Sequence, residues 1–437
     1  MKPVLNIDWD ALTREAVDLL SDYLRVDTIN PPGNETLACE WLGQILDAEG
    51  IPYRTYALDP ARASLVTTLH GDGSRGRPLM LLNHTDVVPA ESDYWTEEPL
   101  SGAVRDGYVW GRGAMDMKGM AIIELMVFLL HHRLGLPLHR DLTFMAVADE
   151  ECGSTYGTEF LDREHAELFD CDFVINEGGT GSQELFGVRR QVFQVGVAEK
   201  GPLWLRLATT GTPGHGSVPH DDNALERLIR AIERIRQWDR PLQETPEVKA
   251  YFEALHRAGV LPDPPTAQRL KALARQHARV HSLQTNSISV TSLHGGMKHN
   301  VIPAHAEATI DVRLVAGYDP ARFMEELRAV IDDPHVEIET VFQSSTPASP
   351  TDTELFRAIQ KAVHDHIKDA VVVPSVATGF TDLRVFRRKG IPSYGFVPVL
   401  LEPEDGGRTH GNDERIGIQS IRLAMQILFA TVREVCE

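Results

Sequence analysis

Cysteine is scarce in this sequence of 437 residues, and no uninterrupted apolar run is long enough to cross a bilayer. The four cysteines, Cys39, Cys152, Cys171 and Cys436, form no CxxC pair, so reduced thiols in a cytoplasm are the simplest interpretation. The longest apolar-looking stretch is interrupted by Glu124. We therefore expect a cytoplasmic protein with no membrane partner.

Basic residues are too few to balance the acids, because 43 Lys and Arg face 63 Asp and Glu, for a formal net charge of −20. This balance argues against a nucleic-acid partner or an anionic membrane surface, although a local site can oppose the overall sign. Residues 1–10 contain no apolar core of the kind that a signal peptide needs. A chain of this length exceeds one ordinary core and suggests two domains.

Helical and strand patterns alternate in the first 180 residues, which predicts an α/β fold with a central sheet. Apolar residues recur at helical spacing in residues 9–26 and 36–49. Short, mostly apolar runs predict buried strands at residues 64–69, 78–82, 142–148 and 172–176. Polar motifs follow three of these strands: Asn83-His84-Thr85-Asp86, Asp149-Glu150-Glu151 and Glu177-Gly178-Gly179. We expect them to meet at one sheet edge, where open α/β sheets place their ligand sites.

The pattern changes near residue 200, and the following elements predict a second domain. Strands, helices and strands are expected in the order βαββαβ, the ferredoxin-like arrangement. Their ranges are 203–209, 223–238, 287–292, 306–314, 320–331 and 335–342. A charged, helix-prone insertion occupies residues 241–282, and a Ser- and Pro-rich linker occupies residues 344–350. The last elements, expected at 354–368, 391–397 and 418–435, rejoin the first domain.

A glycine-rich stretch, Gly111-Arg112-Gly113-Ala114-Met115-Asp116-Met117-Lys118-Gly119, precedes an apolar run at 120–130 that can form a helix. Asp116 therefore lies at a loop-to-helix junction, where glycines allow a sharp turn and a close approach to a ligand. A glycine-rich turn before a helix is more often only a turn. Whether Asp116 binds a ligand or only stands in a turn therefore depends on the other acidic and histidine motifs.

Histidine and carboxylate side chains together suit zinc, and carboxylate-rich sets also admit cobalt or manganese. His84 could bind an ion while Asp86 orients its imidazole ring. Glu150 and Glu151 repel each other, so burying both at a strand end requires a compensating cation. One of them could bind metal while the other stays free as a general base. Taken singly, these residues could equally be solvated surface pairs, acidic loops or turn residues.

Together, these motifs resemble the M20 family of metallopeptidases and amidohydrolases. The family includes aminoacylases, acetylornithine deacetylases, succinyl-diaminopimelate desuccinylases, carboxypeptidases S and bacterial glutamate carboxypeptidases. The resemblance covers nearly the whole chain, through residues 83–86, 110–119, 149–151, 176–179, 214–217, 300–303, 381–382 and 410–414.

The resemblance implies a site for two divalent metal ions, most simply zinc. Asp116 would bridge the ions, with His84 and Glu177 completing one and Glu151 and His410 completing the other. Glu150 would then be the general base, and Asp86 would support His84. The implied fold is a catalytic metal-binding domain of residues 1–199 and 346–437 with an inserted domain at 200–345 that serves as lid and dimerisation surface.

The resemblance also suggests residues that contact substrate. His215 matches a family histidine that reaches the partner subunit's active site, and Asn300 matches a position that helps hold the substrate carboxylate. Gly379 and Thr381 belong to a matching carboxylate-binding loop, although Phe380 stands where relatives often have glycine. The remaining candidate, Arg313, matches a commonly basic position but could equally form a salt bridge.

The predicted function is hydrolysis of the amide bond of N-acyl amino acids or short peptides next to a free carboxylate, by a homodimer. One departure weighs against a glutamate-specific carboxypeptidase, because Gln343 and the residues after it stand where those enzymes carry an arginine. A biosynthetic deacylase of the acetylornithine or succinyl-diaminopimelate type is the alternative within the class. A metal-loaded binding protein without activity is the alternative from another class, and an intact Glu150 argues against it.

Overall fold

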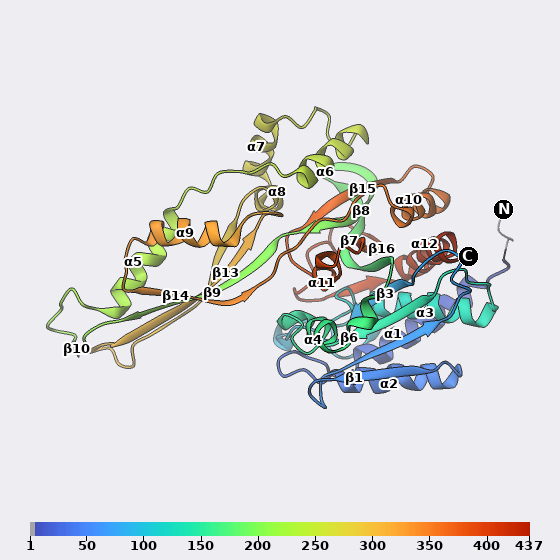
Figure 1. Cartoon of the computed structure of the whole chain (residues 1–437), viewed down its shortest axis with the longest axis horizontal. Coiled ribbons are helices and arrows are strands. Elements are labelled where there is room, and N and C mark those ends of the chain that lie inside the picture. The colour runs from blue at the N-terminus through green and yellow to red at the C-terminus, as the bar shows by residue number, and fades with distance from the viewer. Residues whose placement is uncertain (1–4) are drawn as a thin grey trace.

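A computed structural model describes residues 5–437, which form a large mixed sheet at one end of the molecule and a smaller sheet at the other (Figure 1). The expectation about residues 1–10 therefore falls partly outside the described residues. Among residues 5–437, no helix combines the length and the apolar composition that crossing a membrane requires.

The large sheet has eight strands in the order β1-β2-β6-β3-β7-β16-β8-β15. Neighbouring β6, β3, β7 and β16 run parallel, whereas β1 with β2, β2 with β6, and β16 with β8 are antiparallel. The predicted α/β fold with a central sheet is thus confirmed, and the sheet is mixed. Its strands are β1 (Tyr53–Ala57), β2 (Ala63–Leu69), β3 (Leu79–His84), β6 (Leu142–Val147), β7 (Phe173–Leu185), β8 (Val188–Glu199), β15 (Val371–Ala377) and β16 (Ser393–Leu401).

Helices cover both faces of this sheet because alternate strand residues point to opposite sides. Leu79 and Leu81 of β3 pack into one buried cluster, whereas Met80 and Leu82 pack into another. The first cluster contains residues of α1 (Trp9–Leu24), α2 (Glu35–Ala48), α3 (Lys118–Leu134), α10 (Glu354–His366) and α12 (Ile418–Cys436). The second contains residues of α4 (Thr158–Glu164) and α11 (Leu383–Arg388).

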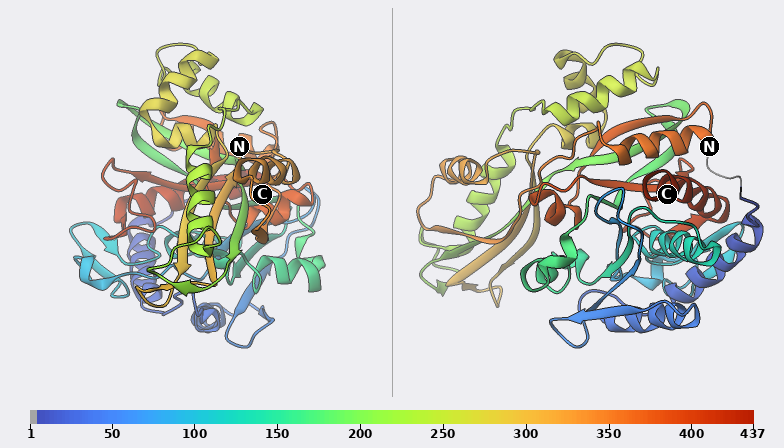
Figure 2. Two further views of the ribbon diagram at one scale, coloured as in Figure 1. Left: turned by 90° about the vertical axis from the view of Figure 1, so that its left-hand side faces the viewer. Right: turned by 45° about the vertical axis from the view of Figure 1, so that its right-hand side comes forward.

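The smaller sheet has four strands in the order β11-β13-β9-β14, which reproduces the predicted βαββαβ sequence of elements. Two helices pack on one face through a separate buried cluster, and Figure 2 shows this unit from two further sides. The other face carries no helix of this unit. The elements are β9 (Gly201–Thr210), α5 (Ala224–Gln237), β11 (Ser287–Gly295), β13 (His305–Leu314), α9 (Pro320–Ile331) and β14 (Val336–Gln343).

Three further helices fall within the range expected for the second domain but pack onto the large sheet. These are α6 (Pro246–Arg257), α7 (Ala267–Gln276) and α8 (Ala278–Leu283). Their buried residues, among them Phe252, Leu255 and Leu283, belong to the first cluster of the large sheet. The insertion predicted at 241–282 therefore extends the larger core.

The end of β7 was mispredicted, and its glycines explain why. β7 continues through Glu177, Gly178 and Gly179 instead of ending at residue 176. A Cβ placed on Gly179 would lie 2.3 Å from the carbonyl oxygen of Gln194 and 2.6 Å from that of Gly395. Glycine is therefore needed here for the close approach of neighbouring strands, and it does not mark a turn.

Several short elements were not predicted. They include a three-stranded sheet of β17 (Arg415–Gly417), β5 (Tyr108–Trp110) and β4 (Ala103–Arg105), and the pair β10 (Gly214–His215) with β12 (Val301–Ile302). Three single 3-10 turns are η1 (Ser92–Tyr94), η2 (Glu150–Cys152) and η3 (Ala166–Phe169).

Candidate metal centre

The acidic and histidine motifs converge where two adjacent strands, β3 and β6, end and where β7 runs on beside them. β6, β3 and β7 are parallel neighbours, so their carboxyl ends meet at one edge. His84 is the last residue of β3, and not the second residue beyond it, because β3 runs two residues further than predicted. Glu150 and Glu151 form η2 directly after β6, and Glu177 lies within β7.

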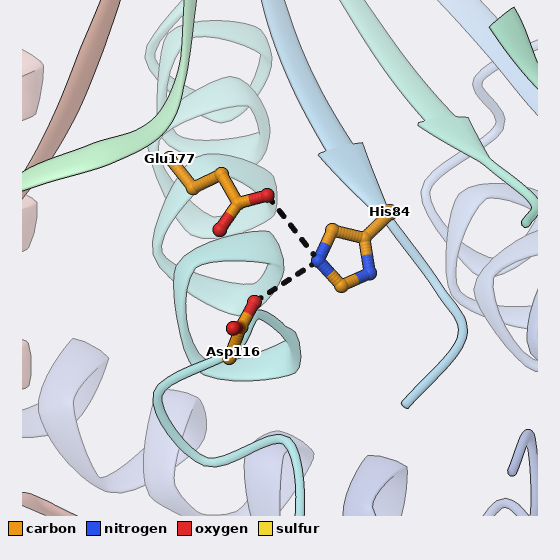
Figure 3. A group of neighbouring side chains, drawn as sticks. All are labelled: His84, Asp116 and Glu177. Carbon is orange, nitrogen blue, oxygen red and sulfur yellow. Dashed lines mark hydrogen bonds and ion pairs between the residues drawn. The ribbon is translucent and has the colours of Figure 1, made fainter. Parts of the chain in front are cut away.

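Asp116 lies between two histidines, and each of its oxygens faces a different ring. Its Oδ1 is 3.1 Å from Nε2 of His84, and its Oδ2 is 3.1 Å from Nε2 of His410. Glu177 Oε1 lies 3.5 Å from the same His84 nitrogen, as Figure 3 shows. On the other side, Glu151 Oε1 lies 3.1 Å from Nε2 of His410. The arrangement places one shared carboxylate between two sets of ligands.

The charge balance of these groups fits a cation. Burial, and then the neighbouring Asp116, raise the pKa of both Glu151 and Glu177. Burial likewise raises the pKa of Glu150 well above its usual range. Hydrogen bonds to Asp116 and Glu151 raise the pKa of His410 to about 10. Glutamates that resist ionisation beside histidines that retain protons are compatible with a site where bound divalent ions would replace those protons.

The ligand spacing also fits a metal. Three groups have donor atoms that all lie within 4.8 Å of one another: His84 with Asp116 and Glu177, Asp116 with Glu151 and His410, and His84 with Glu150 and Glu151. Two ligands at tetrahedral angles on one zinc ion stand about 3.3 Å apart, close to the 3.1 Å and 3.5 Å measured around His84. The residues present therefore suit divalent metal.

Asp86 contacts both the His84 ring and the turn of Glu150 and Glu151, and so supports the cluster of candidate ligands. The Nδ1 atom of His84 lies 3.0 Å from the backbone oxygen of Asp86 and 3.4 Å from its Oδ1, which leaves Nε2 facing the other candidate ligands. The same carboxylate accepts hydrogen bonds from the backbone N–H groups of Glu150 and Glu151, each at 3.1 Å. Asn30, which belongs to none of the predicted site motifs, donates to it at 2.8 Å. Asp86 thus couples the His84 ring to the turn that carries the two glutamates.

Glu414 is a second residue that sequence reasoning missed, although it lies within a quoted motif. Its Oε1 accepts the backbone N–H groups of Met115 and Asp116 at 2.7 and 3.0 Å. Its Oε2 accepts from the Arg112 guanidinium at 2.7 Å and from the Gly113 N–H at 3.2 Å. Both carboxylate oxygens therefore fix the glycine-rich loop that presents Asp116. A sequence signal for this contact existed, because the backbone N–H groups of a glycine-rich loop need a hydrogen-bond acceptor.

We expect Glu414→Gln to lower the free energy of unfolding by about 3 kcal/mol, because the buried Arg112 guanidinium loses its counter-charge. Glu97→Gln is the matched control, since Glu97 pairs with Arg105 at 2.7 Å in an exposed position, where the change should stay below about 1 kcal/mol. Denaturant unfolding of the three proteins measures both values. Equal, small changes in the free energy of unfolding of the two variants would contradict the role of Glu414 in holding the Asp116 loop.

The predicted substrate-binding residues lie in two separate places. Arg313 and Thr381 lie where the smaller sheet meets the large one. The Arg313 guanidinium is 4.8 Å from the Phe380 ring centre and pairs with Asp311 at 2.8 Å. The Thr381 hydroxyl is buried and donates to Glu199 at 3.0 Å. Two residues before Thr381, Gly379 is exposed.

His215 is on β10, which Figure 1 shows at the far end of the smaller sheet, away from β3 and β6 of the large sheet. β10 pairs with β12, and the N–H of Gly216 donates to the Asn300 carbonyl at 2.9 Å. The His215 ring is exposed, and its Nδ1 is 2.7 Å from the Ser217 hydroxyl. Within a single chain the structure does not bring these two residues to the candidate metal centre.

Comparison with known proteins identifies related sequences over most of the chain. The sequence model of peptidase family M20/M25/M40 matches residues 80–434. The Dictyostelium discoideum protein named "Probable carboxypeptidase S-like 2" is 30% identical over 389 residues, which are 85% of this chain and 74% of that protein. Aminoacylase-1 of Sus scrofa is 28% identical over 407 residues, which are 92% of this chain and 90% of that protein.

Solved structures share the fold at lower sequence identity. The M20 family metallo-carboxypeptidase Sso-CP2 from Sulfolobus solfataricus superposes with a TM-score of 0.75 at 17% identity, covering 96% of this chain and 99% of that one. The di-peptidase Dug1p from Saccharomyces cerevisiae gives a TM-score of 0.72 at 16% identity, covering 98% and 97% of the two chains.

Proposed function

The chain belongs to peptidase family M20/M25/M40, and we propose from this membership and its site that it is a metal-dependent hydrolase of N-acyl amino acids or short peptides. The scissile bond would be the amide next to a free carboxylate. The observation that carries the proposal is the pair of histidines on opposite oxygens of Asp116, with three glutamates close by. Deacylation of a biosynthetic intermediate would be a narrower use of the same chemistry.

We further propose that two divalent ions, most simply zinc, are held at this site. Asp116 would be shared between them, with His84 and Glu177 on one side and Glu151 and His410 on the other. Cobalt and manganese also suit this set of nitrogen and carboxylate ligands. Such ions supply Lewis-acid polarisation of a carbonyl and activation of water.

Glu150 is our candidate for the general base. It is buried beside His84 and Glu151, and burial raises its pKa, which is the direction that makes a carboxylate a stronger proton acceptor. It would take the proton of the attacking water and pass it to the leaving amine. Asp86 would keep the His84 ring in place during this transfer, through the contacts at its Nδ1.

For the domain organisation, we propose that residues 200–345, apart from the helices α6, α7 and α8 that pack onto the large sheet, form a lid and dimerisation unit on a catalytic part made of 1–199 and 346–437. β10, which carries His215 and pairs with β12 next to Asn300, lies away from β3 and β6 (Figure 1), which supports a role of these two residues in the site of a partner subunit. In that position His215 would donate to the oxyanion that develops on the scissile carbonyl. Closure of the unit would also exclude water from the site.

A turnover screen tests the proposed function. Protein stripped of metal with a chelator is offered N-acetyl amino acids and dipeptides, before and after addition of zinc, cobalt or manganese. We expect release of free amino acid only after metal is restored. A protein that regains bound metal yet cleaves none of these amides would support the alternative of a non-catalytic metal-binding protein.

A further inference from the structure

Three aromatic side chains meet where the smaller sheet faces the large one. Trp204 is on β9, Phe342 on β14, and Phe380 in the loop before α11. Their ring centres are 5.1 Å apart for Trp204 and Phe342, 5.7 Å for Phe342 and Phe380, and 5.9 Å for Trp204 and Phe380. Each ring is partly exposed, and none belongs to the three buried clusters formed within residues 5–437. We call these three residues the aromatic cluster.

The aromatic cluster occupies one end of the sheet face that α5 and α9 leave uncovered. Phe342 pairs with Trp204 in the sheet register, so the two rings stand side by side on that face. Further along the same strands, the face becomes charged, where Arg206 contacts Glu307 and Glu339. The apolar end is the one next to the large sheet, because β9 begins directly after β8.

The aromatic cluster also borders the turn that carries the candidate general base. A Cβ placed on Gly153 would lie 3.5 Å from Cε2 of Phe342, and Gly153 directly follows Glu150–Cys152. Arg384 links the same parts, since its guanidinium donates to the Gly153 carbonyl at 3.0 Å and lies 4.9 Å from the Phe380 ring centre. Phe342 therefore lies against the turn that follows Glu150 and Glu151, and Arg384 joins this turn to Phe380.

We propose that the aromatic cluster is an apolar subsite that makes the enzyme prefer substrates with a large apolar group, aromatic or long aliphatic, beside the scissile amide. The proposal rests on the proposed function, because the subsite has meaning only beside a site that cleaves amides. The apolar group can stand on the acyl side or on the amino-acid side of the bond. Both share the same recognition chemistry, and the experiment below separates them.

The two arginines beside the aromatic cluster each have partners within the chain. Arg313, which lies over Phe380, is held by both oxygens of Asp311. Arg384 is fully buried and donates to the carbonyls of Thr381 and Gly153. What remains for a substrate is the partly exposed surface of the three rings, which gains most from contact with apolar groups.

Two substrate series test the proposal. One varies the acyl chain of N-acyl-alanine from acetyl to octanoyl, and the other varies the amino acid of N-acetyl substrates from alanine to phenylalanine. In the series whose group enters the subsite, kcat/KM of the wild-type enzyme should rise by up to about fourfold per methylene. In Phe342→Ala and Phe380→Ala this rise should flatten, mainly through KM, while activity on N-acetyl-alanine is kept.

Val341→Ala is the matched control, because Val341 precedes Phe342 on β14 and is 59% exposed; its series should follow the wild type. Phe380→Leu, which keeps an apolar side chain in the loop, should retain most of the rise and guards against a folding defect. Normal turnover with flat wild-type series would overturn the subsite and leave the proposed function intact. An equal loss for every substrate in the Ala variants would also overturn it, since that result describes a packing role. Absence of all turnover with metal restored would instead mark failure of the proposed function.

Discussion

Replacing Glu150 by glutamine should reduce turnover on the order of 10²–10⁴-fold while the bound metal is retained, because the amide cannot accept a proton. The expectation follows from the place of Glu150, which is buried after β6 beside His84 and Glu151. Its backbone N–H donates to Asp86 at 3.1 Å, so the turn should keep its shape when the side chain changes. Steady-state kinetics together with elemental analysis of the same sample measure both quantities.

Glu151→Gln provides the contrast, because the structure places Glu151 against His410. This variant should lose metal, and added metal should restore part of its activity. Near-normal rates in Glu150→Gln would show that another group accepts the proton. Loss of metal from Glu150→Gln would instead make Glu150 a ligand.

Replacing His215 by alanine should lower turnover about 10²–10³-fold, the size expected when one oxyanion donor is removed. Because His215 is remote from its own metal centre, we expect the lost activity to return when a partner subunit supplies the ring. Mixing His215→Ala with Glu150→Gln chains creates dimers in which one site has an intact Glu150 and receives an intact His215. With random exchange of a two-fold dimer in an equimolar mixture, about a quarter of all sites should be active, which corresponds to about a quarter of the wild-type activity.

Subunit exchange must be shown independently, by two affinity tags recovered on one particle. Each variant alone, taken through the same exchange procedure, is the control and should stay inactive. Confirmed mixed dimers without recovered activity would contradict a role of His215 in the partner's site.

The elements of the fold that depend on local sequence patterns could be predicted from the sequence. The strands around residues 79–84 and 142–147 are apolar on both faces because helices cover both sides of the sheet, and such runs are recognisable. The candidate ligands could be predicted because His84 and the two glutamates directly follow or end these strands. Their convergence then depended only on the parallel order of neighbouring strands.

What the sequence could not predict depends on contacts between distant segments. Gly179 reads as a turn residue, yet it is required by the approach of two other strands. Glu414 lies 298 residues from Asp116, and only the fold shows that it holds the Asp116 loop. Phe380 was noticed as a departure from the family pattern, but its partners Trp204 and Phe342 come from the other sheet.

The metal content of the native protein tests the central claim most directly. Protein purified without chelators and supplied with zinc should hold two ions per chain by elemental analysis, and Asp116→Asn should lose both, because this carboxylate faces both histidines. A native stoichiometry that stays at or below one ion per chain after supplementation would contradict the two-ion site centred on Asp116.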